Sequence, residues 1–483
     1  MRVTCSLILA VFSIPSSAQA QTGRELIERV ATAMGGVRRI MSVKTISLRG
    51  TGENYNFGQN HTPDSDLPMF TVTKYLRVID FANSRWRQDQ TREPRFITGN
   101  TTPQRSRIGF DVVAYDITSD TSMRRLGGRA PVDRRAELIV HPIGFLQAAL
   151  APGARLEELA PKNSLRRARL DVDGERYTMS VDTKTMLPAQ IERTIPNTTL
   201  GDISLVNEFP KWYAASDVRV PIEIIQRIDG RWRLSRLDFD GIRIDGDIGD
   251  ITVPESIRND PLQPVNINVT VDSIAPGVWL LAGGSHHSVA IEMKDHLVLV
   301  EAPQNDDRVL AVIRKARSLR PEKPLRAVIN THHHFDHSGG IRAAISEGLT
   351  VITHNANKQF FQNLAARRFT IQPDQLARSP RKAVIEGVTD KRSITDGTRV
   401  IDVYAIGGSA HSGSILMVHL PAEKLLIEAD LYTPPAVPTP MPFAANLLEN
   451  IESRSIQVER IVPIHGRVVP FSDLKAAVAA PAR

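Results

Sequence analysis

The chain has 483 residues, of which 41% are hydrophobic and 23% charged, and its formal net charge is +7. This length exceeds what one ordinary hydrophobic core supports, so we expect two domains. The balance of apolar and charged residues excludes a disordered chain. Lys and Arg are spread along the sequence without runs of five or more, which argues against a nucleic-acid partner. A mildly basic surface instead favours small anionic substrates.

The first twenty residues have the features of a secretory signal peptide. Arg2 provides a positive start, residues 5–14 are mostly apolar, and Ala18 and Ala20 flank Gln19 at a small-residue cleavage site. The apolar run is far shorter than the roughly 20 residues of a membrane-spanning helix. We therefore predict a periplasmic or secreted protein that is cleaved near Ala20 and has no transmembrane segment after removal of the signal.

The single cysteine, Cys5, lies inside this predicted signal. The mature chain is then expected to contain neither a disulfide nor a thiolate metal ligand. Any metal site must be built from histidines and carboxylates.

Residues 21–265 are expected to form a β-rich N-terminal domain. A short helix over 25–34 precedes strand-like segments with partial period-two alternation at 73–81, 176–183, 221–228 and 231–239, and a helical interruption is expected at 131–150. This pattern predicts an antiparallel sheet with helices, and no residue in it indicates catalytic chemistry. Three prolines among polar residues mark 251–268 as a linker, which places the boundary near 265.

The C-terminal part, residues 266–483, changes to strands that alternate with helices. Apolar strand-like segments at 277–284, 296–303, 325–331 and 349–354 are interleaved with helical patterns at 307–319 and 339–348. Alternation of this kind predicts an α/β layer structure. Functional side chains in such folds gather where strands end and loops begin.

The segment 331–340, THHHFDHSGG, follows an apolar strand, and four of the thirteen histidines of the chain fall within six residues of it. Zinc binds neutral imidazole and carboxylate, and a catalytic zinc usually keeps one position for water. Spacing of the type His-x-His-x-Asp-His lets His332 and His334 face one side while Asp336 and His337 turn to another. Downstream, His411, Asp430 and His465 each follow an apolar strand-like run. Seven ligands from four strand ends predict a two-metal site.

These residues, in this order, resemble the metallo-β-lactamase superfamily over about residues 268–483. That superfamily includes zinc β-lactamases, glyoxalase II enzymes, acyl-homoserine lactonases, alkylsulfatases and some nucleases. The resemblance implies an αββα sandwich preceded by the β-rich domain. It also implies two Zn²⁺ ions, with iron or manganese as alternatives. The implied ligands are His332, His334 and His411 for one metal, Asp336, His337 and His465 for the other, and Asp430 as the bridge.

Three other residues are candidates for the surroundings of these metals. His287, with its neighbour His286, lies in a glycine-rich turn that packs beside the metals in this superfamily, and a solvated turn is the alternative. Glu301 stands where members often have an aspartate that supports a ligand histidine, against an ordinary strand-end carboxylate. Tyr432 is a candidate donor to an oxyanion, and a packed aromatic is the alternative. His333 and Phe335 are expected to be non-ligand spacers.

The sequence thus predicts an exported binuclear zinc-dependent hydrolase that directs a metal-bridging hydroxide at an ester, thioester, lactone or β-lactam in a small molecule. Asp336 is the expected catalytic residue, which orients the nucleophile and carries a proton to the leaving group. Two alternatives remain open. One is an envelope protein whose N-terminal sheet captures a lipid or apolar ligand beside a metal-loaded scaffold, and the other is an iron-dependent redox member of the superfamily. The sequence leaves the oligomeric state open.

Overall fold

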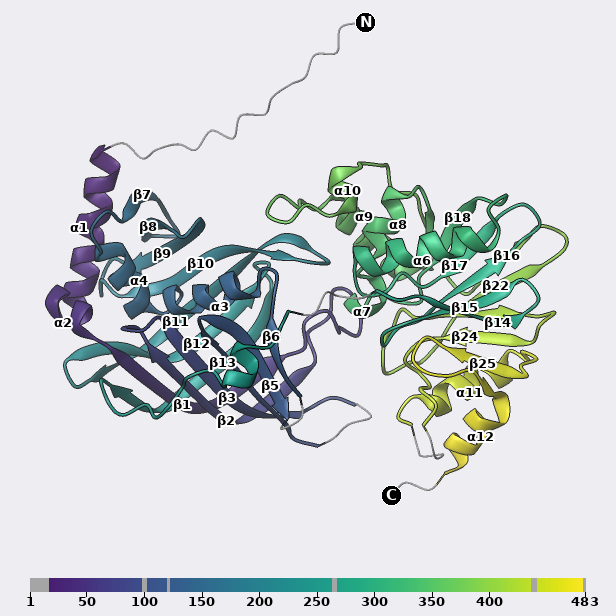
Figure 1. Ribbon diagram of the computed structural model, residues 1–483, viewed down its shortest axis with the longest axis horizontal. Coiled ribbons are helices and arrows are strands. Elements are labelled where there is room, and N and C mark those ends of the chain that lie inside the picture. Colours follow the sequence, from purple (N-terminus) through teal and green to yellow (C-terminus); the bar gives the residue numbers. More distant parts are fainter. Residues whose placement is uncertain (1–16, 98–101, 120–121, 263–266, 436–440, 481–483) are drawn as a thin grey trace, which may run out of the picture.

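The computed structural model (Figure 1) describes residues 17–97, 102–119, 122–262, 267–435 and 441–480. Most of the predicted signal peptide lies outside these residues, and the expected cleavage site near Ala20 falls in the first turn of helix α1 (Ser17–Ala33). The expected domain boundary near 265 falls between the last strand of the first sheet and the first strand of the second. No helix among the described residues is both long and apolar enough to cross a membrane.

The N-terminal half is built on one antiparallel sheet of thirteen strands. The sheet order is β6-β5-β4-β3-β2-β1-β13-β12-β11-β10-β9-β8-β7. The chain runs outward from β1 to β6, continues at the opposite edge with β7 and returns inward to β13, which pairs with β1 in the middle of the sheet. The four predicted strand-like segments coincide with β2, β9, β12 and β13, and three of them were predicted one residue beyond an observed strand end. The strands are β1 (Thr45–Tyr55), β2 (Met69–Asp80), β3 (Arg85–Pro94), β4 (Gln104–Asp111), β5 (Val113–Ser119), β6 (Ser122–Leu126), β7 (Arg155–Lys162), β8 (Leu165–Val172), β9 (Glu175–Asp182), β10 (Pro188–Asn197), β11 (Gly201–Ala215), β12 (Val218–Ile228) and β13 (Trp232–Ile244).

Helices α1, α2 (Val37–Ser42), α3 (Ala130–Ile139) and α4 (Pro142–Leu150) lie against one side of this curved sheet (Figure 1). The helix expected at 131–150 is two helices. Proline disfavours a helical conformation in the residue before it, so His141 is extended and Pro142 starts a new helix. The Nδ1 atom of His141 accepts the backbone N–H of Ile143, 3.3 Å away, and so caps α4.

The C-terminal half is an αββα sandwich, as predicted. Apolar side chains of a seven-stranded and a six-stranded sheet share one core between the sheets. The strands are β14 (Thr270–Ala275), β15 (Val278–Ala282), β16 (Ser288–Glu292), β17 (Leu297–Val300), β18 (Leu325–Ile329), β19 (Thr350–His354) and β20 (Ile385–Val388) in the first sheet, and β21 (Lys391–Thr395), β22 (Val400–Ala405), β23 (Leu416–Leu420), β24 (Leu425–Glu428), β25 (Arg460–Pro463) and β26 (Val469–Pro470) in the second.

Helices cover the outer face of each sheet through separate apolar clusters. The first sheet carries α6 (Asp306–Leu319), α8 (Ile341–Ser346), α9 (Lys358–Ala366) and α10 (Gln375–Arg378), with the short α7 (Phe335–Ser338) and η1 (Asn355–Asn357) in its connections, and the second carries α11 (Ala444–Ser453) and α12 (Phe471–Ala479). Between the halves, the described part of the linker contains the one-turn helix α5 (Glu255–Arg258).

Two regions of contact lie between described residues of the two halves. At one, Leu200 and Ile203 of the N-terminal sheet share a cluster with Phe361 of α9, and an ion pair of 2.7 Å joins Arg367 to Asp229. At the other, residues 56–68, which connect β1 to β2, reach α7. We call this segment the β1–β2 loop. It lies beside the segment that contains the predicted metal ligands.

Candidate metal centre

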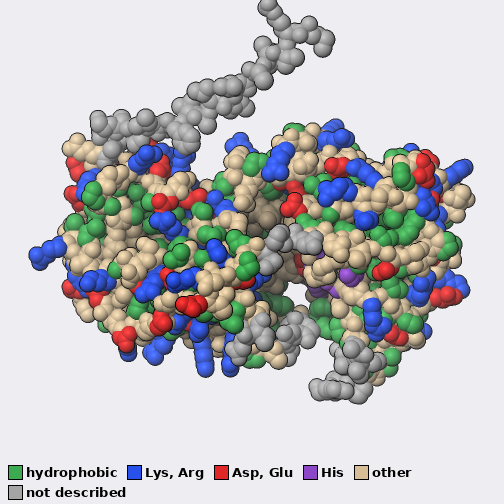
Figure 2. Space-filling model, viewed as in Figure 1, with side chains coloured by type: hydrophobic (Ala, Val, Ile, Leu, Met, Phe, Trp, Pro, Cys, Tyr) green, Lys and Arg blue, Asp and Glu red, His purple; other side chains and the backbone are tan. Residues whose placement is uncertain are grey.

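The predicted ligands converge on one edge of the sandwich because each one follows, or lies between, strands that end there. The 331–337 segment leads from β18 into α7, His411 lies between β22 and β23, Asp430 follows β24, and His465 follows β25. Asp430 has a left-handed backbone conformation with φ of 64°. Figure 2 shows histidine side chains at the hollow between the two halves of the molecule.

The structure brings all seven predicted ligands together in two groups. In each group, one nitrogen or oxygen of every member lies within 4.8 Å of those of the others. Asp430 lies between the groups. Its Oδ2 is 2.9 Å from His411 Nε2 and 3.0 Å from His337 Nε2, and its Oδ1 is 2.8 Å from His465 Nε2. The groups are His332, His334, His411 and Asp430, and His286, Asp336, His337 and His465.

Four of the histidines are held by the ring nitrogen that points away from the centre. His332 Nδ1 lies 3.0 Å from the hydroxyl of Thr331, and His337 Nδ1 lies 3.2 Å from Glu301. The other two histidines contact backbone carbonyl oxygens. His465 Nδ1 lies 2.9 Å from Ser285 O, and His334 Nε2 lies 2.8 Å from Asn60 O. Such outer contacts orient each ring so that its inner nitrogen can bind a metal once that nitrogen carries no proton.

The donor set fits a metal in a second respect. His334 Nδ1 is buried and has no hydrogen-bond partner among the described residues, although buried polar atoms are normally paired. It faces the rest of its group. Imidazole nitrogens and carboxylate oxygens without thiolate are the ligands of catalytic zinc sites and also suit iron and manganese.

Burial sets the protonation of these imidazoles. It lowers the pKa of His332 well below the usual range, with the charge of His337 acting in the same direction. It lowers the pKa of His334 to about 4, aided by His411. Both rings are therefore neutral and keep a lone pair for a metal. Burial opposes ionisation of Asp430, but the charge of His337 and the contacts of its carboxylate with His332, His337 and His411 lower its pKa well below the ordinary value.

Glu301 lies where a supporting carboxylate was predicted. It is fully buried. One oxygen, Oε2, accepts from Thr331 Oγ1 at 2.6 Å and lies 3.2 Å from His337 Nδ1, and the other accepts from Asn330 Nδ2 at 2.9 Å. One side chain thus ties the start of the metal-binding segment to a ligand on α7.

Of the two neighbouring histidines in the glycine-rich turn, the structure places His286, not His287, in a metal group. His286 Nε2 is 3.3 Å from Asp336 Oδ2. The ring of His287 points away, and its Nδ1 accepts the backbone N–H of Gly283 at 3.4 Å. Successive residues of an extended chain face opposite sides, so only one of the pair can reach the metals.

Tyr432 lies outside the pocket and does not reach the metals. Its side chain is buried in the apolar cluster beneath α11 and α12, while its neighbours Leu431 and Thr433 line the pocket. Tyr432 is therefore a packed aromatic residue, as the alternative interpretation of the sequence had it. His333 also stays outside both groups, with its Nδ1 3.4 Å from Ser414 Oγ, and Phe335 packs edge-on against Phe57 with ring centres 5.2 Å apart.

A pocket of about 650 Å³ opens onto this centre, and both halves of the chain form its walls. The C-terminal half supplies His334, His411 and Asp430 together with Phe443. The N-terminal half supplies part of the β1–β2 loop and the ends of β2 and β3, including Gln59, His61, Phe70, Arg92 and Phe96.

Two contacts from the β1–β2 loop reach the ligands themselves. Gln59 Nε2 donates to Asp336 Oδ1 at 2.8 Å, and the backbone oxygen of Asn60 accepts a hydrogen bond from His334 Nε2. The sequence did not reveal these residues, because the loop has no periodic pattern and its partners lie more than 270 positions away.

Arg92 is a half-buried cation in the pocket wall. Its guanidinium lies 4.1 Å from the ring centre of Phe70 and donates to Gln104 at 3.0 Å. No carboxylate pairs with it in the described part of the chain, and the neighbouring residues 98–101 contain none. Burial lowers the pKa of Arg92, yet arginine remains charged. Arg92 is therefore a positive charge in the pocket wall that forms no ion pair with a described carboxylate, although the exposed Asp66 also lines the pocket.

The αββα sandwich and the paired histidine–aspartate groups define a metallo-hydrolase type of domain. Residues 281–446 match the family model of the metallo-beta-lactamase superfamily, and this part of the chain belongs to that superfamily. Solved structures similar to it include a metallo-beta-lactamase from Pontibacter korlensis, with 18% identity over 44% of this chain and 98% of that one and a TM-score of 0.35. Another, from Hirschia baltica, has 19% identity over 44% and 99%, with a TM-score of 0.35. A third is FIM-1 from Pseudomonas aeruginosa in its mono-zinc form, with 17% identity over 44% and 95% and a TM-score of 0.35. No curated protein matches the chain.

Proposed function

We propose that the protein is a binuclear metal-dependent hydrolase that acts on small-molecule esters, thioesters, lactones or β-lactams. One observation carries the proposal. Two groups of four donors share the Asp430 carboxylate between them, and the outer nitrogens of the histidines are held so that the inner ones face the centre. The domain's membership of the superfamily supports the same reaction class.

Two bound zinc ions would supply a hydroxide nucleophile at neutral pH and positive charge for a developing oxyanion. The remaining roles belong to the chain. Asp336 orients the attacking water and passes its proton to the leaving group. Gln59 donates to Oδ1 of Asp336 and His286 faces Oδ2, so the carboxylate is held at both oxygens while the reaction proceeds.

The pocket walls favour a substrate that combines an apolar part with an anionic group. Phe70, Phe96, Met441 and Phe443 provide the apolar surface. Arg92 supplies the unpaired positive charge, and a carboxylate on the substrate would complete the ion pair.

The test is hydrolysis of a panel by the full mature chain, with metal content measured in the same preparation. The panel contains nitrocefin, a homoserine lactone, S-lactoylglutathione and the p-nitrophenyl phosphate, sulfate and acetate esters. We expect hydrolysis of at least one of the β-lactam, lactone, thioester and acetate ester substrates by a chain that binds about two zinc ions. We also expect His334→Ala to lower kcat/KM by at least about 100-fold.

The matched control is His354→Ala, which removes a histidine of the same domain that lies in neither metal group. It should keep activity and metal content. A chain that binds one iron and hydrolyses nothing would contradict the hydrolase proposal. Equal losses in His334→Ala and His354→Ala would show that folding, not the metal centre, is being measured.

We further propose that the protein is exported to the periplasm or secreted. The support is the composition of residues 2–20, with a basic start, an apolar run and small residues before Gln21. N-terminal sequencing of the chain from the host's periplasmic fraction and culture medium should give a start close to Gln21. An intact Met1 or Arg2 on chain recovered only from the cytoplasm would contradict it.

A further inference from the structure

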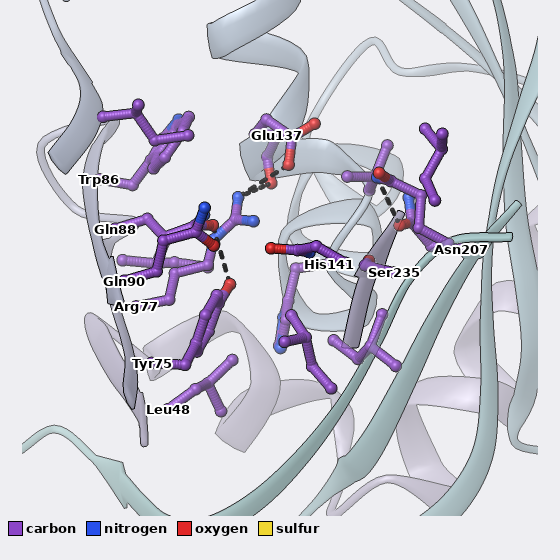
Figure 3. Close-up of a pocket in the computed structure, with 18 of the residues that line it drawn as sticks. Leu48, Tyr75, Arg77, Trp86, Gln88, Gln90, Glu137, His141, Asn207 and Ser235 are labelled. Carbon is purple, nitrogen blue, oxygen red and sulfur yellow. Dashed lines mark hydrogen bonds and ion pairs between the residues drawn. The ribbon is translucent and has the colours of Figure 1, made fainter. Parts of the chain in front are cut away.

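A second cavity lies inside the N-terminal domain, away from the metal ligands (Figure 3). It encloses about 420 Å³, which falls within the range of small-molecule sites. One wall is the inner face of strands β1 to β4 and β10 to β13. The other wall is α3 and the turn into α4, from which Asp133, Arg134, Glu137 and His141 reach the cavity.

The strand pattern places polar residues on this inner face. Side chains alternate between the two faces of a strand, and a face covered by helices normally carries apolar residues. Here most of the lining positions alternate along the strands, but polar and apolar residues are mixed among them. They include Tyr75, Arg77 and Ile79 in β2, Trp86, Gln88, Gln90 and Arg92 in β3, Asn207 and Phe209 in β11, Ile224 and Gln226 in β12, and Ser235, Leu237 and Phe239 in β13.

Some of these polar groups satisfy one another, as the dashed lines in Figure 3 show. Tyr75 donates to Gln88 at 2.9 Å, and Arg77 donates to Glu137 at 3.0 Å. Gln226 donates to Asn207 at 3.2 Å. These bonds leave several donors over.

Four buried nitrogens of the lining have no acceptor among the described residues: Arg77 Nε, His141 Nε2, Arg193 Nε and Asn207 Nδ2. His141 is only 4% exposed. Because its Nδ1 accepts a backbone N–H, its Nε2 carries the hydrogen and is a donor. Among the buried side-chain oxygens of the described lining, only Asn54 Oδ1 has no hydrogen-bond partner. Unpaired donors therefore outnumber unpaired acceptors, so a ligand that supplies oxygen acceptors would complete these hydrogen bonds.

The lining contains four arginines and two carboxylates. Arg77 and Arg193 pair with the carboxylates Glu137 and Asp133, and Arg134 pairs with Asp116 outside the lining. The charges of these three arginines are therefore balanced, and the case for an acceptor ligand rests on the nitrogens without acceptors. In Figure 3 the side chains of Arg77, Glu137 and His141 meet on the helix side of the cavity. Apolar residues such as Leu48, Ile79 and Phe239 form the rest of the lining.

We propose that this cavity is a binding site for an amphiphilic carboxylate, with the carboxylate at the Arg77–His141 side and a medium-length apolar chain along the sheet. The site is separate from the metal centre and does not depend on the proposed hydrolase function. A cavity that holds only water would satisfy the same nitrogens, and the following experiment separates the two cases.

The probe is decanoate, titrated into the full mature chain by calorimetry below the concentration at which it forms micelles. We expect saturable binding of one decanoate per chain and at least ten-fold weaker binding of decanol, which has the same chain without the carboxylate. Absence of saturable decanoate binding would overturn the proposal. Equal affinity for decanol would overturn it as well.

Two variants locate the site. Ser235→Trp adds a bulky ring to an inward position of β13 and should weaken decanoate binding at least ten-fold, whereas Ser273→Trp, on an exposed position of β14, should not change it. His141→Leu should weaken decanoate more than decanol. Unchanged binding by Ser235→Trp would overturn the assignment even if His141→Leu failed to fold. Arg92 is not used, because it also lines the metal pocket.

Discussion

At the scale of single residues, the metal centre depends on carboxylates and carbonyls that never face the metals. Glu301 is the clearest case. It has a left-handed backbone conformation with φ of 75°, which is costly for a residue other than glycine, and it is fully buried. The conformation aims both oxygens at the segment that precedes and includes the ligands.

Glu301→Gln tests this support. Glutamine has nearly the same shape, but its amide nitrogen is a donor where Glu301 now accepts from Thr331 and Asn330. We expect zinc affinity to fall by about 10- to 100-fold, measured by competition with a chelator. Glu322→Gln, an exposed carboxylate of the same domain, is the control and should bind zinc as the original chain does. Unchanged affinity in Glu301→Gln would refute the role.

His141 makes a second prediction, about stability and pH. Burial lowers its pKa to about 3, and the nearby charge of Arg77 adds to the effect. The unfolded chain has a pKa near 6.5 at this residue, so between these values the unfolded state binds more protons than the folded state. Folding stability should therefore fall as the pH drops below about 6.5, by up to about 1.4 kcal/mol per pH unit.

The comparison is with His141→Asn, which keeps an acceptor at the start of α4 but does not titrate. Urea unfolding of the metal-depleted chain at pH 7.5 and pH 5 should show that the original chain loses about 2 kcal/mol more than the variant. Equal losses in both proteins would mean that His141 is protonated in the folded state.

At the scale of elements, the β1–β2 loop is the connection that the metal centre needs most. Gly58 has φ of 83°, and a Cβ added there would overlap the ring of Phe335. The backbone carbonyl of Gly58 also accepts the N–H of Phe335 at 3.2 Å. The loop can follow α7 this closely only because the residue is glycine.

Gly58→Ala should therefore displace the loop and with it Gln59 and Asn60. We expect at least a ten-fold loss of kcat/KM and weaker zinc binding in a chain that remains folded. Gly230→Ala is the matched control, because Gly230 has φ of 66° and no atom lies near its added Cβ. Gly230→Ala also places a Cβ on a residue with positive φ, but that Cβ overlaps no neighbouring atom. Equal effects in the two variants would show that backbone strain alone is responsible.

The contrast between the loop and the ligand segment shows what the sequence could predict. The ligands stand at short spacings after apolar strands, so strand ends and zinc chemistry together predicted where they meet. Asn60 and Gln59 act through contacts with residues more than 270 positions away, over half of the chain length, and no local pattern encodes these contacts. His286 and His287 differ only in which side of the turn they face. The break before Pro142 was readable from that proline, but the prediction of one helical segment at 131–150 rested on apolar spacing and did not use it.

At the scale of the whole molecule, the pocket exists only where the two halves meet. Arg367 and Asp229 join them on one side, and the β1–β2 loop joins them at the metals. The half without the metal ligands thereby brings Arg92 to the pocket wall. The predicted metal ligands belong to the C-terminal half, and under the proposed function we attribute part of the choice of substrate to the N-terminal half.

Arg92→Met tests that division. Methionine keeps an unbranched apolar side chain against Phe70 but removes the charge. For a carboxylate-bearing substrate we expect KM to rise and kcat/KM to fall by about 10- to 100-fold, as for loss of a charge-assisted hydrogen bond. For a neutral ester or lactone both constants should stay within about two-fold, since the metal ligands are untouched. Arg95→Met is the control, because Arg95 is exposed one residue beyond the end of the same strand and does not line the pocket. If Arg92→Met slowed charged and neutral substrates alike, Arg92 would be a structural residue of the wall, and the anionic substrate class would have to be abandoned while the hydrolase assignment stood.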